Sequence, residues 1–206
     1  MLKHWLAKKR SRLGLGNSQQ GFSLTEMGIA IAITLVLLAF AIPNTAAMIA
    51  DMRLRNSASE VSSLIQLVRL QAVRKNTTSS LLFGLPTGQG ACVDTNSNGQ
   101  CDPNEPLVQF GGTVSKVNAP TGSAGSPSPL DGPSGPLGWT ATAGNVSFNA
   151  RGLTCDNTHT PCATGVNYVF YLNDTRAFGK SAWAAISVTA AGRSQAWIWN
   201  GSAWVN

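Results

Sequence analysis

The chain has 206 residues, a length that allows one globular domain of ordinary size and an extension. Charged residues make up 12% of the sequence, compared with about 25% in a typical soluble domain. The formal net charge is +6, but five of the 15 Lys and Arg residues precede residue 22, in a stretch without Asp or Glu. The remaining chain has ten basic and nine acidic residues, so charge alone does not indicate a nucleic-acid-binding protein.

The first apolar segment runs from Met27 to Ala50, 24 residues without a formal charge. A helix that spans the hydrocarbon core needs about 20 mostly apolar residues, so this segment is long enough. The basic residues before it are expected to stay in the cytoplasm, which places the C-terminal domain across the membrane. A secretory signal is cut after its apolar run, whereas the candidate cleavage site here, between Gly21 and Phe22, precedes it. The mature protein would therefore keep the apolar helix.

The residues Gly21–Glu26, GFSLTE, closely resemble the type III signal of type IV pilins and type II secretion pseudopilins. This resemblance implies that a prepilin peptidase cuts after Gly21 and methylates the new amine of Phe22. Glu26 then stands where the family keeps an acidic residue. A carboxylate at the edge of a membrane helix is costly without a partner, and the Phe22 amine of a neighbouring subunit would offset that cost and set the axial register. The alternative is an ordinary signal-anchor helix with Glu26 at the level of the lipid headgroups.

Pro43 lies within the apolar segment and has no N–H to donate, so we expect it to bend or locally melt the helix. Pilins commonly carry a proline here, and the resemblance implies that the helix melts during filament assembly. Proline is also tolerated in membrane helices generally.

Helical periodicity continues beyond Asp51 as an amphipathic pattern. One apolar stripe recurs in steps of three and four residues, formed by Leu54, Ala58, Val61, Ile65, Val68 and Ala72. The pattern predicts that the helix continues from residue 51 to residue 76. This segment resembles the second half of the long N-terminal helix of a pilin, which implies that the apolar stripe packs on a sheet.

After Asn76 the sequence consists of short β-prone runs separated by Gly, Pro, Asn and Ser. The predicted strands are Ser79–Phe83, Leu107–Phe110, Asn145–Phe148, Val166–Leu172, Ala184–Thr189 and Ser194–Asn200. The segment 116–139 contains five prolines and five glycines and is interpreted as a long surface loop.

Three sequence runs in this part, FNARGL (Phe148–Leu153), YVFYLND and the terminal AISVTAAGRSQAWIWNG, resemble the GspH/FimT group of minor pilins and pseudopilins. The resemblance implies a helix followed by strands, with a Gly-Arg hairpin near the C-terminus. We therefore expect an α+β type IV pilin fold, in which a long N-terminal helix, transmembrane and then amphipathic, packs on a mostly antiparallel sheet. The expected parts are a leader (1–21), a membrane and assembly helix (22–50), its amphipathic continuation (51–76) and a periplasmic β-rich domain (77–206).

Four cysteines occur as two close pairs, Cys92 with Cys101 and Cys155 with Cys162. Four cysteines allow three disulfide connectivities, which the sequence does not distinguish. Local pairing is preferred because each intervening loop contains turn formers. Neither spacing is a C-x-x-C motif, and an exported, oxidising location is the simplest interpretation.

The segment DTNSNGQCDPNE matches the calcium-loop pattern D-x-[DN]-x-[DN]-G-x5-E. The pattern would place six residues around a hard cation: Asp94, Asn96, Asn98, Gln100 (through its carbonyl), Asp102 and Glu105. The flanking residues are not helical, and Asp, Asn and Gly also serve turn geometry. A Cys92–Cys101 disulfide would further constrain the loop. Calcium binding and a purely structural turn are therefore both open.

A DNA site is the second candidate. Group members tied to DNA uptake resemble one another in a basic Gly-Arg-x-Arg hairpin, and here Arg193 is present while Gln195 replaces the second arginine. Arg176, Lys180 and Arg151 are candidates to join Arg193 in a basic patch. Binding of this kind rests on several phosphate contacts, so one arginine fewer weakens it.

Three C-terminal tryptophans, Trp197, Trp199 and Trp204, allow three interpretations. They would stack on bases, dock onto an adjacent minor pilin, or close the core of the domain itself. The two histidines, His4 and His159, do not form a metal cluster, and no catalytic motif was found, so we expect no enzymatic activity.

The expected function is that of a minor pilin that primes or joins the tip of a type IV pilus, in support of adhesion, twitching motility or DNA uptake. The alternatives are a minor pseudopilin of a type II secretion system and a DNA-binding module at the pilus tip. The expected partners are prepilin peptidase, the bacterial inner membrane and other major and minor pilins.

Overall fold

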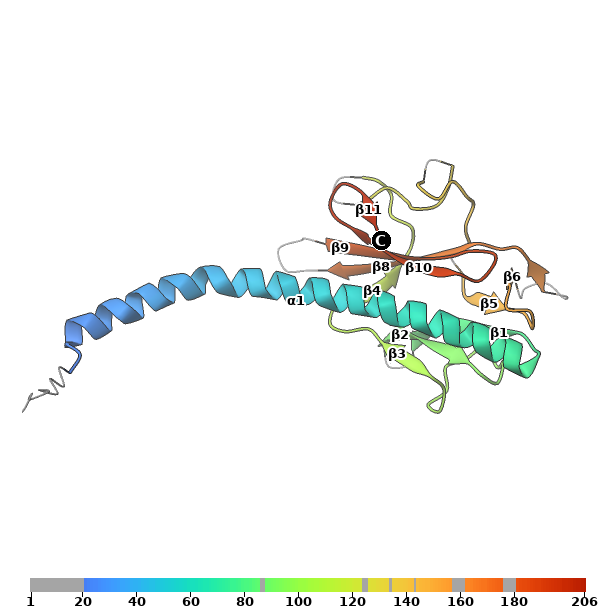
Figure 1. Ribbon diagram of the computed structural model, residues 1–206, viewed down its shortest axis with the longest axis horizontal. Helices are drawn as coiled ribbons and strands as arrows, with labels where there is room; N and C mark the ends of the chain where they lie inside the picture. The colour runs from blue at the N-terminus through green and yellow to red at the C-terminus, as the bar shows by residue number, and fades with distance from the viewer. Residues whose placement is uncertain are drawn as a thin grey trace, which may run out of the picture. The chain divides into compact units, whose positions relative to one another are not determined.

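The computed structural model describes residues 21–206 except 86–87, 124–125, 134, 143, 157–161 and 176–180. Two compact units are distinguished, one ending at Pro43 and one comprising Asn44–Asn206, and each is described by itself. One helix, α1 (Leu24–Lys75), contributes to both units (Figure 1). Its helical backbone continues through Pro43, and melting at this residue during assembly stays a prediction.

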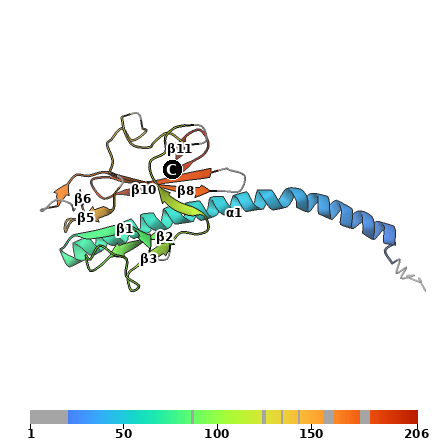
Figure 2. The ribbon, with the colours of Figure 1, turned by 180° about the vertical axis from the view of Figure 1, so that it is seen from behind.

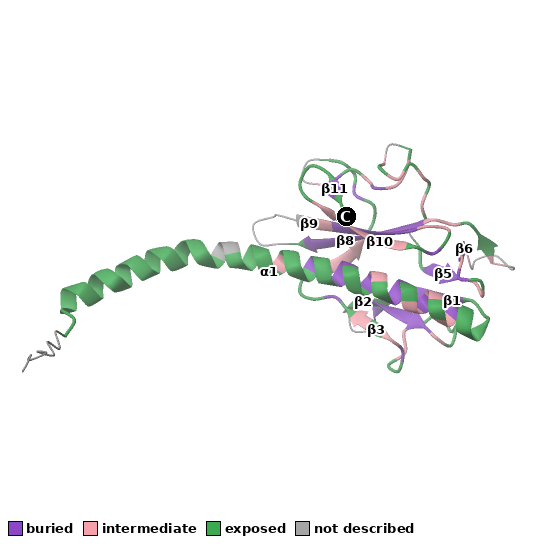
Figure 3. Ribbon diagram, in the orientation of Figure 1, coloured by how far each residue is buried: buried purple, intermediate pink, exposed green. Residues whose placement is uncertain are grey.

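In the first unit, the described side chains of α1, up to Ile42, are exposed. Leu24 is 90% exposed and Phe40 is 76% exposed, although both are strongly apolar. Figure 3 shows this stretch of the helix in the colour of exposed residues. By length and composition α1 can cross a membrane, and it is the one such helix in the described part of the chain.

The second unit combines the rest of α1 with two antiparallel sheets (Figures 1 and 2). The strands are β1 (Ser79–Leu85), β2 (Gly88–Asp94), β3 (Leu107–Gln109), β4 (Val114–Val117), β5 (Val146–Phe148), β6 (Thr154–Asp156), β7 (Ala163–Thr164), β8 (Tyr168–Thr175), β9 (Ser181–Val188), β10 (Ser194–Trp199) and β11 (Trp204–Val205). The first sheet has the order β3-β2-β1-β5-β6-β7, and the second has the order β11-β10-β9-β8-β4. The predicted α+β class, with a long helix on antiparallel sheets, is confirmed.

The core forms where the amphipathic half of α1 packs on both sheets. The predicted stripe from Leu54 to Ala72 is buried, with exposures of 1% or less for its six members. Phe83 on β1 and Phe170 on β8 join the two sheets, with ring centroids 4.6 Å apart. The second sheet is therefore fixed relative to the helix through one continuous apolar cluster.

Each of the six predicted strands corresponds to an observed one, with ends shifted by at most three residues. Strands β2, β4, β6, β7 and β11 were not predicted. Strand β2 contains Gly88 and Gly90, which are typical of turns. Gly90 is instead required by packing, because a Cβ at this position would lie 2.4 Å from Leu85 Cδ1 and from the Val108 carbonyl oxygen.

The described residues from 118 to 139 form neither a helix nor a strand, which agrees with the predicted loop, but two features of the segment differ from a free surface loop. Lys116 and Val117 belong to β4, and Leu130 is completely buried. The Tyr171 hydroxyl accepts a hydrogen bond from Leu130 N at 2.9 Å, and Trp204 Nε1 donates to the Ser128 carbonyl at 2.8 Å. The segment is thus packed against the second sheet, and its buried leucine was hidden among turn-forming residues.

Candidate functional site

The start of α1 carries a reciprocal cap. Ser23 N donates to Glu26 Oε2 at 3.1 Å, while Glu26 N donates to Ser23 Oγ at 3.4 Å. This is the capping box of a Ser-x-x-Glu sequence, which satisfies two N–H groups that a helix start leaves without partners. The motif was readable in the sequence, but the interpretation of Glu26 as an assembly residue left its capping role unrecognised.

Phe22, directly before the cap, is 90% exposed. From this residue the apolar surface continues along α1 through Ile29, Leu35 and Phe40 to Ile42, all more than half exposed. An uncovered apolar surface of this extent marks a membrane or protein interaction site. Glu26 is the only acidic residue within it, and its carboxylate lies at the helix N-terminus, where the helix dipole favours negative charge.

The loop that follows β2 is organised by its own acidic side chains. Asp94 is 4% exposed, and its two carboxylate oxygens accept hydrogen bonds from Asn98 N at 3.2 Å and Gly99 N at 2.9 Å. Asp102 Oδ2 accepts from Asn96 Nδ2 and from Asn98 Nδ2, both at 2.8 Å. The predicted cation ligands thus face groups of the loop itself.

Glu105 closes the same loop and is 6% exposed. Its Oε1 accepts from Thr95 N at 2.5 Å and Thr95 Oγ1 at 2.9 Å, and its Oε2 accepts from Asp102 N at 3.0 Å. Burial raises the pKa of the Glu105 carboxyl, but the hydrogen bonds from Asp102 and Thr95 outweigh burial and hold this pKa below its ordinary value near 4.5. The carboxylate is therefore stabilised in its charged form by the loop backbone.

The same loop is joined to β2 by the Cys92–Cys101 disulfide, and the second disulfide is Cys155–Cys162. Both preferred local pairings are confirmed. Within the described residues, no group of three or more His, Cys, Asp or Glu side chains is arranged to hold a metal ion. Calcium also binds amide and backbone oxygens, so the calcium hypothesis stays a prediction, while the hydrogen bonds favour a structural turn.

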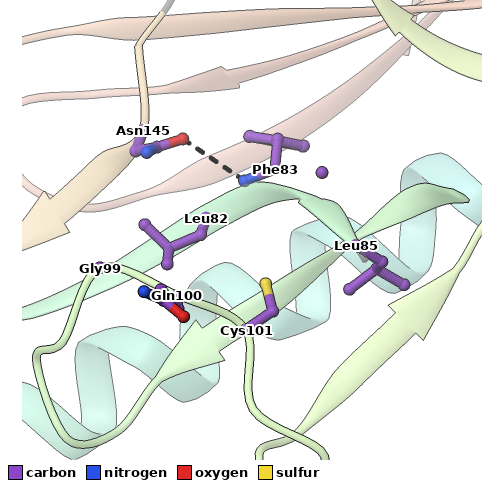
Figure 4. A pocket seen from close by; sticks show the side chains of 8 residues that line it. Leu82, Phe83, Leu85, Gly99, Gln100, Cys101 and Asn145 are labelled. Atoms are coloured by element: carbon purple, nitrogen blue, oxygen red, sulfur yellow. Dashed lines mark hydrogen bonds between the residues drawn. The ribbon is translucent and has the colours of Figure 1, made fainter. Parts of the chain in front are cut away.

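A pocket of about 330 Å³ lies between this loop and β1 (Figure 4). Gly99, Gln100 and Cys101 form its loop side, and Leu82 and Leu85 belong to β1. Asn145 Oδ1 accepts a hydrogen bond from Phe83 N at 3.3 Å across one wall. The residues that line the pocket are uncharged, and its polar side chains are the amides of Gln100 and Asn145.

Two turns that carry the exposed residues Arg151 and Arg193 lie beside each other near the end of α1. Arg69 Nε donates to the Gly152 carbonyl at 3.0 Å, and a Cβ on Gly192 would lie 2.8 Å from that same oxygen. The turn that carries Arg151 and the hairpin that carries Arg193 are therefore neighbours. The structure confirms neither Arg176 nor Lys180 as a member of this patch, because both lie outside the described residues.

The C-terminal tryptophans divide between two environments. Trp204 is 8% exposed and packs against Tyr171, with ring centroids 6.1 Å apart, so it closes the core of its own domain. Trp197 and Trp199 are half-buried on the outer face of the second sheet, and Trp197 Nε1 donates to Ser187 Oγ at 2.8 Å. The exposed parts of these two rings are available to a partner.

Comparisons with known proteins gave two matches. The model of the GspH family, type II transport protein GspH, matches residues 57–192, from the amphipathic half of α1 to the hairpin before β10. Among solved structures, the type IV minor pilin FimU of Pseudomonas aeruginosa is similar, with 16% sequence identity, a TM-score of 0.43, and coverage of 74% of this chain and 92% of its own. No match was found among curated proteins.

Proposed function

Because the chain belongs to the GspH family of type II transport proteins, we propose that it is a minor filament subunit that primes or joins the tip of a type IV pilus. The observation that carries this proposal is the exposed apolar half of α1, which begins at the Ser23–Glu26 cap. In the proposed topology this helix anchors the precursor in the bacterial inner membrane, with the domain in the periplasm. Other pilins then cover it in the filament.

Processing supplies the first test. We propose that prepilin peptidase cleaves after Gly21 and methylates the new amine of Phe22. Mass spectrometry of the chain from its native host should give an N-terminal methylated phenylalanine. A Gly21→Ala variant should retain the leader, and an intact wild-type leader would contradict the proposal.

Assembly supplies the second test. Replacement of Glu26 by Ala removes the carboxylate proposed to pair with a neighbouring Phe22 amine, whereas Thr25→Ala leaves it in place. The Glu26 variant should remain in the membrane fraction but be absent from sheared filaments. Recovery of this variant in filaments at the wild-type level would refute the proposed role of Glu26.

The alternative within the same class is a minor pseudopilin of a type II secretion system, the system named in the family description. A clean deletion distinguishes the two functions when pilus number, protein secretion and transformation are scored in parallel. Under our proposal, pilus number or pilus-dependent behaviour falls and secretion is unchanged. Loss of secretion with normal pili would assign the chain to the secretion system.

DNA binding is a second candidate because Arg151 and Arg193 lie on adjacent turns. Each phosphate that a protein neutralises contributes about 0.9 to the steepness with which log K falls against log salt. A double Arg151→Ala, Arg193→Ala variant should therefore lower that slope by about 2 in a gel-shift titration. Arg55→Ala is a matched control, because Arg55 lies 14 residues before Arg69 on α1, or roughly 20 Å along the helix axis. Equal retardation of all three proteins would exclude this site.

A further inference from the structure

Strand β10 is an edge strand that is only half covered. On one side it pairs with β9 in an unbroken register from Ser194↔Val188 to Ile198↔Ala184. On its other side β11 pairs at two positions, Ile198↔Val205 and Trp199↔Trp204. The half of β10 from 194 to 197 is therefore an open edge of the second sheet.

Two hydrogen bonds show which backbone groups point out from this edge. Thr189 N donates to the Arg193 carbonyl at 2.9 Å, so odd-numbered residues in this register face β9. Asn200 N donates to the Ala203 carbonyl at 3.1 Å, so even-numbered residues face the outer side. In an antiparallel ladder these directions alternate from residue to residue. The N–H and C=O groups of residues 194 and 196 therefore point outward.

These four outward groups have no hydrogen-bond partner in the part of the chain that the structure describes. The preceding outward group, the Gly192 carbonyl, accepts from Gln66 Nε2 of α1 at 3.3 Å. The same amide donates to Ser194 Oγ at 2.9 Å, which occupies the serine side chain but not its backbone. The helix thus ends the open edge at Gly192 and leaves residues 194 and 196 without partners.

Apart from the contacts that Ser62 and Gln66 of α1 make with the Ser194 side chain, the open edge carries no feature that protects it against another strand in the described part of the chain. Natural edge strands carry lysine, proline or a bulge, which prevent pairing with another chain. Residues 194–197 are Ser, Gln, Ala and Trp, all half-buried, and their register with β9 contains no bulge. Strand β11 shows that the adjacent half of the same edge accepts an antiparallel strand.

We propose that the open half of β10 binds an extended, uncharged segment of a neighbouring filament subunit, added to the sheet in line with β11. Two donors and two acceptors at strand spacing match another peptide backbone, and the half-exposed ring of Trp197 beside them contacts a side chain of the added strand. This inference rests on the proposed function, because it assigns the partner to the filament. It gives the domain a specific contact in addition to that of the apolar helix.

Hydrogen exchange at single-residue resolution tests the proposal on the full chain, free in detergent and assembled in purified filaments. The amides of Ser194 and Ala196 should exchange rapidly in the free chain and about tenfold or more slowly in filaments. The amides of Gln195 and Trp197 face β9 and should be protected in both states, which makes them internal controls. Unchanged exchange of Ser194 and Ala196 in filaments that contain the chain would overturn this inference and leave the filament role intact.

A pair of variants supplies a second measurement. Ala196→Pro removes an outward N–H that the β9 ladder does not use, whereas Ala196→Ser keeps it. The proline variant should be depleted from filaments, and the serine variant should be present at the wild-type level. Normal incorporation of the proline variant would refute strand addition. Concentration-dependent protection of the Ser194 and Ala196 amides in the free chain would also refute it, because the edge would then bind a second copy of the same chain. Absence of the wild-type chain from all filaments would instead refute the proposed function.

Discussion

Replacement of Glu105 by Gln tests whether the loop after β2 is held by its own carboxylate. The substitution keeps one oxygen for Thr95 but places an NH₂ group against Asp102 N, two donors facing each other. A hydrogen bond to a charged group contributes about 1.5–3 kcal/mol, so we expect a loss of about 2–3 kcal/mol in the free energy of unfolding. For a chain of this size, the melting temperature should fall by roughly 2–4 °C per kcal/mol.

The pH dependence of the same variant gives an independent readout. The folded pKa of Glu105 is lowered, so its contribution to stability is fully present above the unfolded value near 4.5. That contribution is lost as the pH falls through the lowered folded pKa. The wild-type chain should therefore lose stability on acidification below about pH 4.5, and Glu105→Gln should lose less over that range.

The assay is thermal unfolding of the full-length chain in detergent, followed by tryptophan fluorescence between pH 3 and 7, with and without calcium. Equal stability and equal acid sensitivity of the two proteins would refute the role of the Glu105 carboxylate. Calcium distinguishes the two interpretations of the loop. A bound ion at a concentration 100-fold above its Kd stabilises the native state by about 2.7 kcal/mol. If calcium raises the stability of the wild-type chain by this amount and not that of the variant, the loop is a calcium site and not a purely structural turn.

Three further predictions use the same melt or circular dichroism. Leu130→Ala should cost about 2–5 kcal/mol because the side chain is completely buried under the second sheet, and an unchanged melt would show that the segment 116–139 is not packed. Gly192→Ala should cost about 1–3 kcal/mol, since its φ is +80° and a Cβ would lie 2.8 Å from the Gly152 carbonyl; Gly201→Ala, at φ +100° with no atom within 4 Å, controls for the backbone strain. Ser23→Ala removes the N-cap of α1, which should destabilise the helix by about 0.5–2 kcal/mol and reduce its helicity in detergent. Equal ellipticity of variant and wild type would contradict the capping box with Glu26.

Much of the fold was predictable because its strongest signals are local. The 24 uncharged residues from Met27 to Ala50 indicate a long apolar helix, and the Leu54–Ala72 stripe marks the one face of its continuation that is buried. The Cys92–Cys101 pairing is confirmed as well, and it was preferred because the segment between the two cysteines contains several turn-forming residues. Signals of this kind depend only on residues that are close in the sequence, so a single sequence is sufficient to detect them.

The missed elements depend on contacts between distant segments. Strand β2 has weak propensity of its own, and its Gly90 is explained by the approach of Leu85 and Val108. Leu130 is buried in a cluster with Val169 and Tyr171, and the Tyr171 hydroxyl, 41 residues later in the chain, accepts a hydrogen bond from its N–H. No local pattern encodes either contact.

The same reason explains what was missed at the candidate sites. The turns of Arg151 and Arg193 are neighbours because Arg69 binds the Gly152 carbonyl and Gly192 packs against the same oxygen. The sequence alone does not show these contacts. The open edge of β10 follows from how far β11 extends, a property of the assembled sheet. The Ser23–Glu26 cap is the exception, because its spacing was visible in the sequence.

The contact between α1 and β10 has a consequence for the order of folding. Ser62 Oγ and Ser194 Oγ are 2.8 Å apart although 132 residues separate them in the chain. In the proposed topology the helix is the first part to enter the membrane and β10 is among the last to cross it. The apolar stripe of the helix therefore has no complete cover until translocation is almost finished, which leaves it exposed to premature association. The cysteines of the two disulfides are separated by only nine and seven positions in the sequence, so both disulfides can form before β10 has crossed the membrane. They then restrict the conformations that the incompletely translocated chain can adopt.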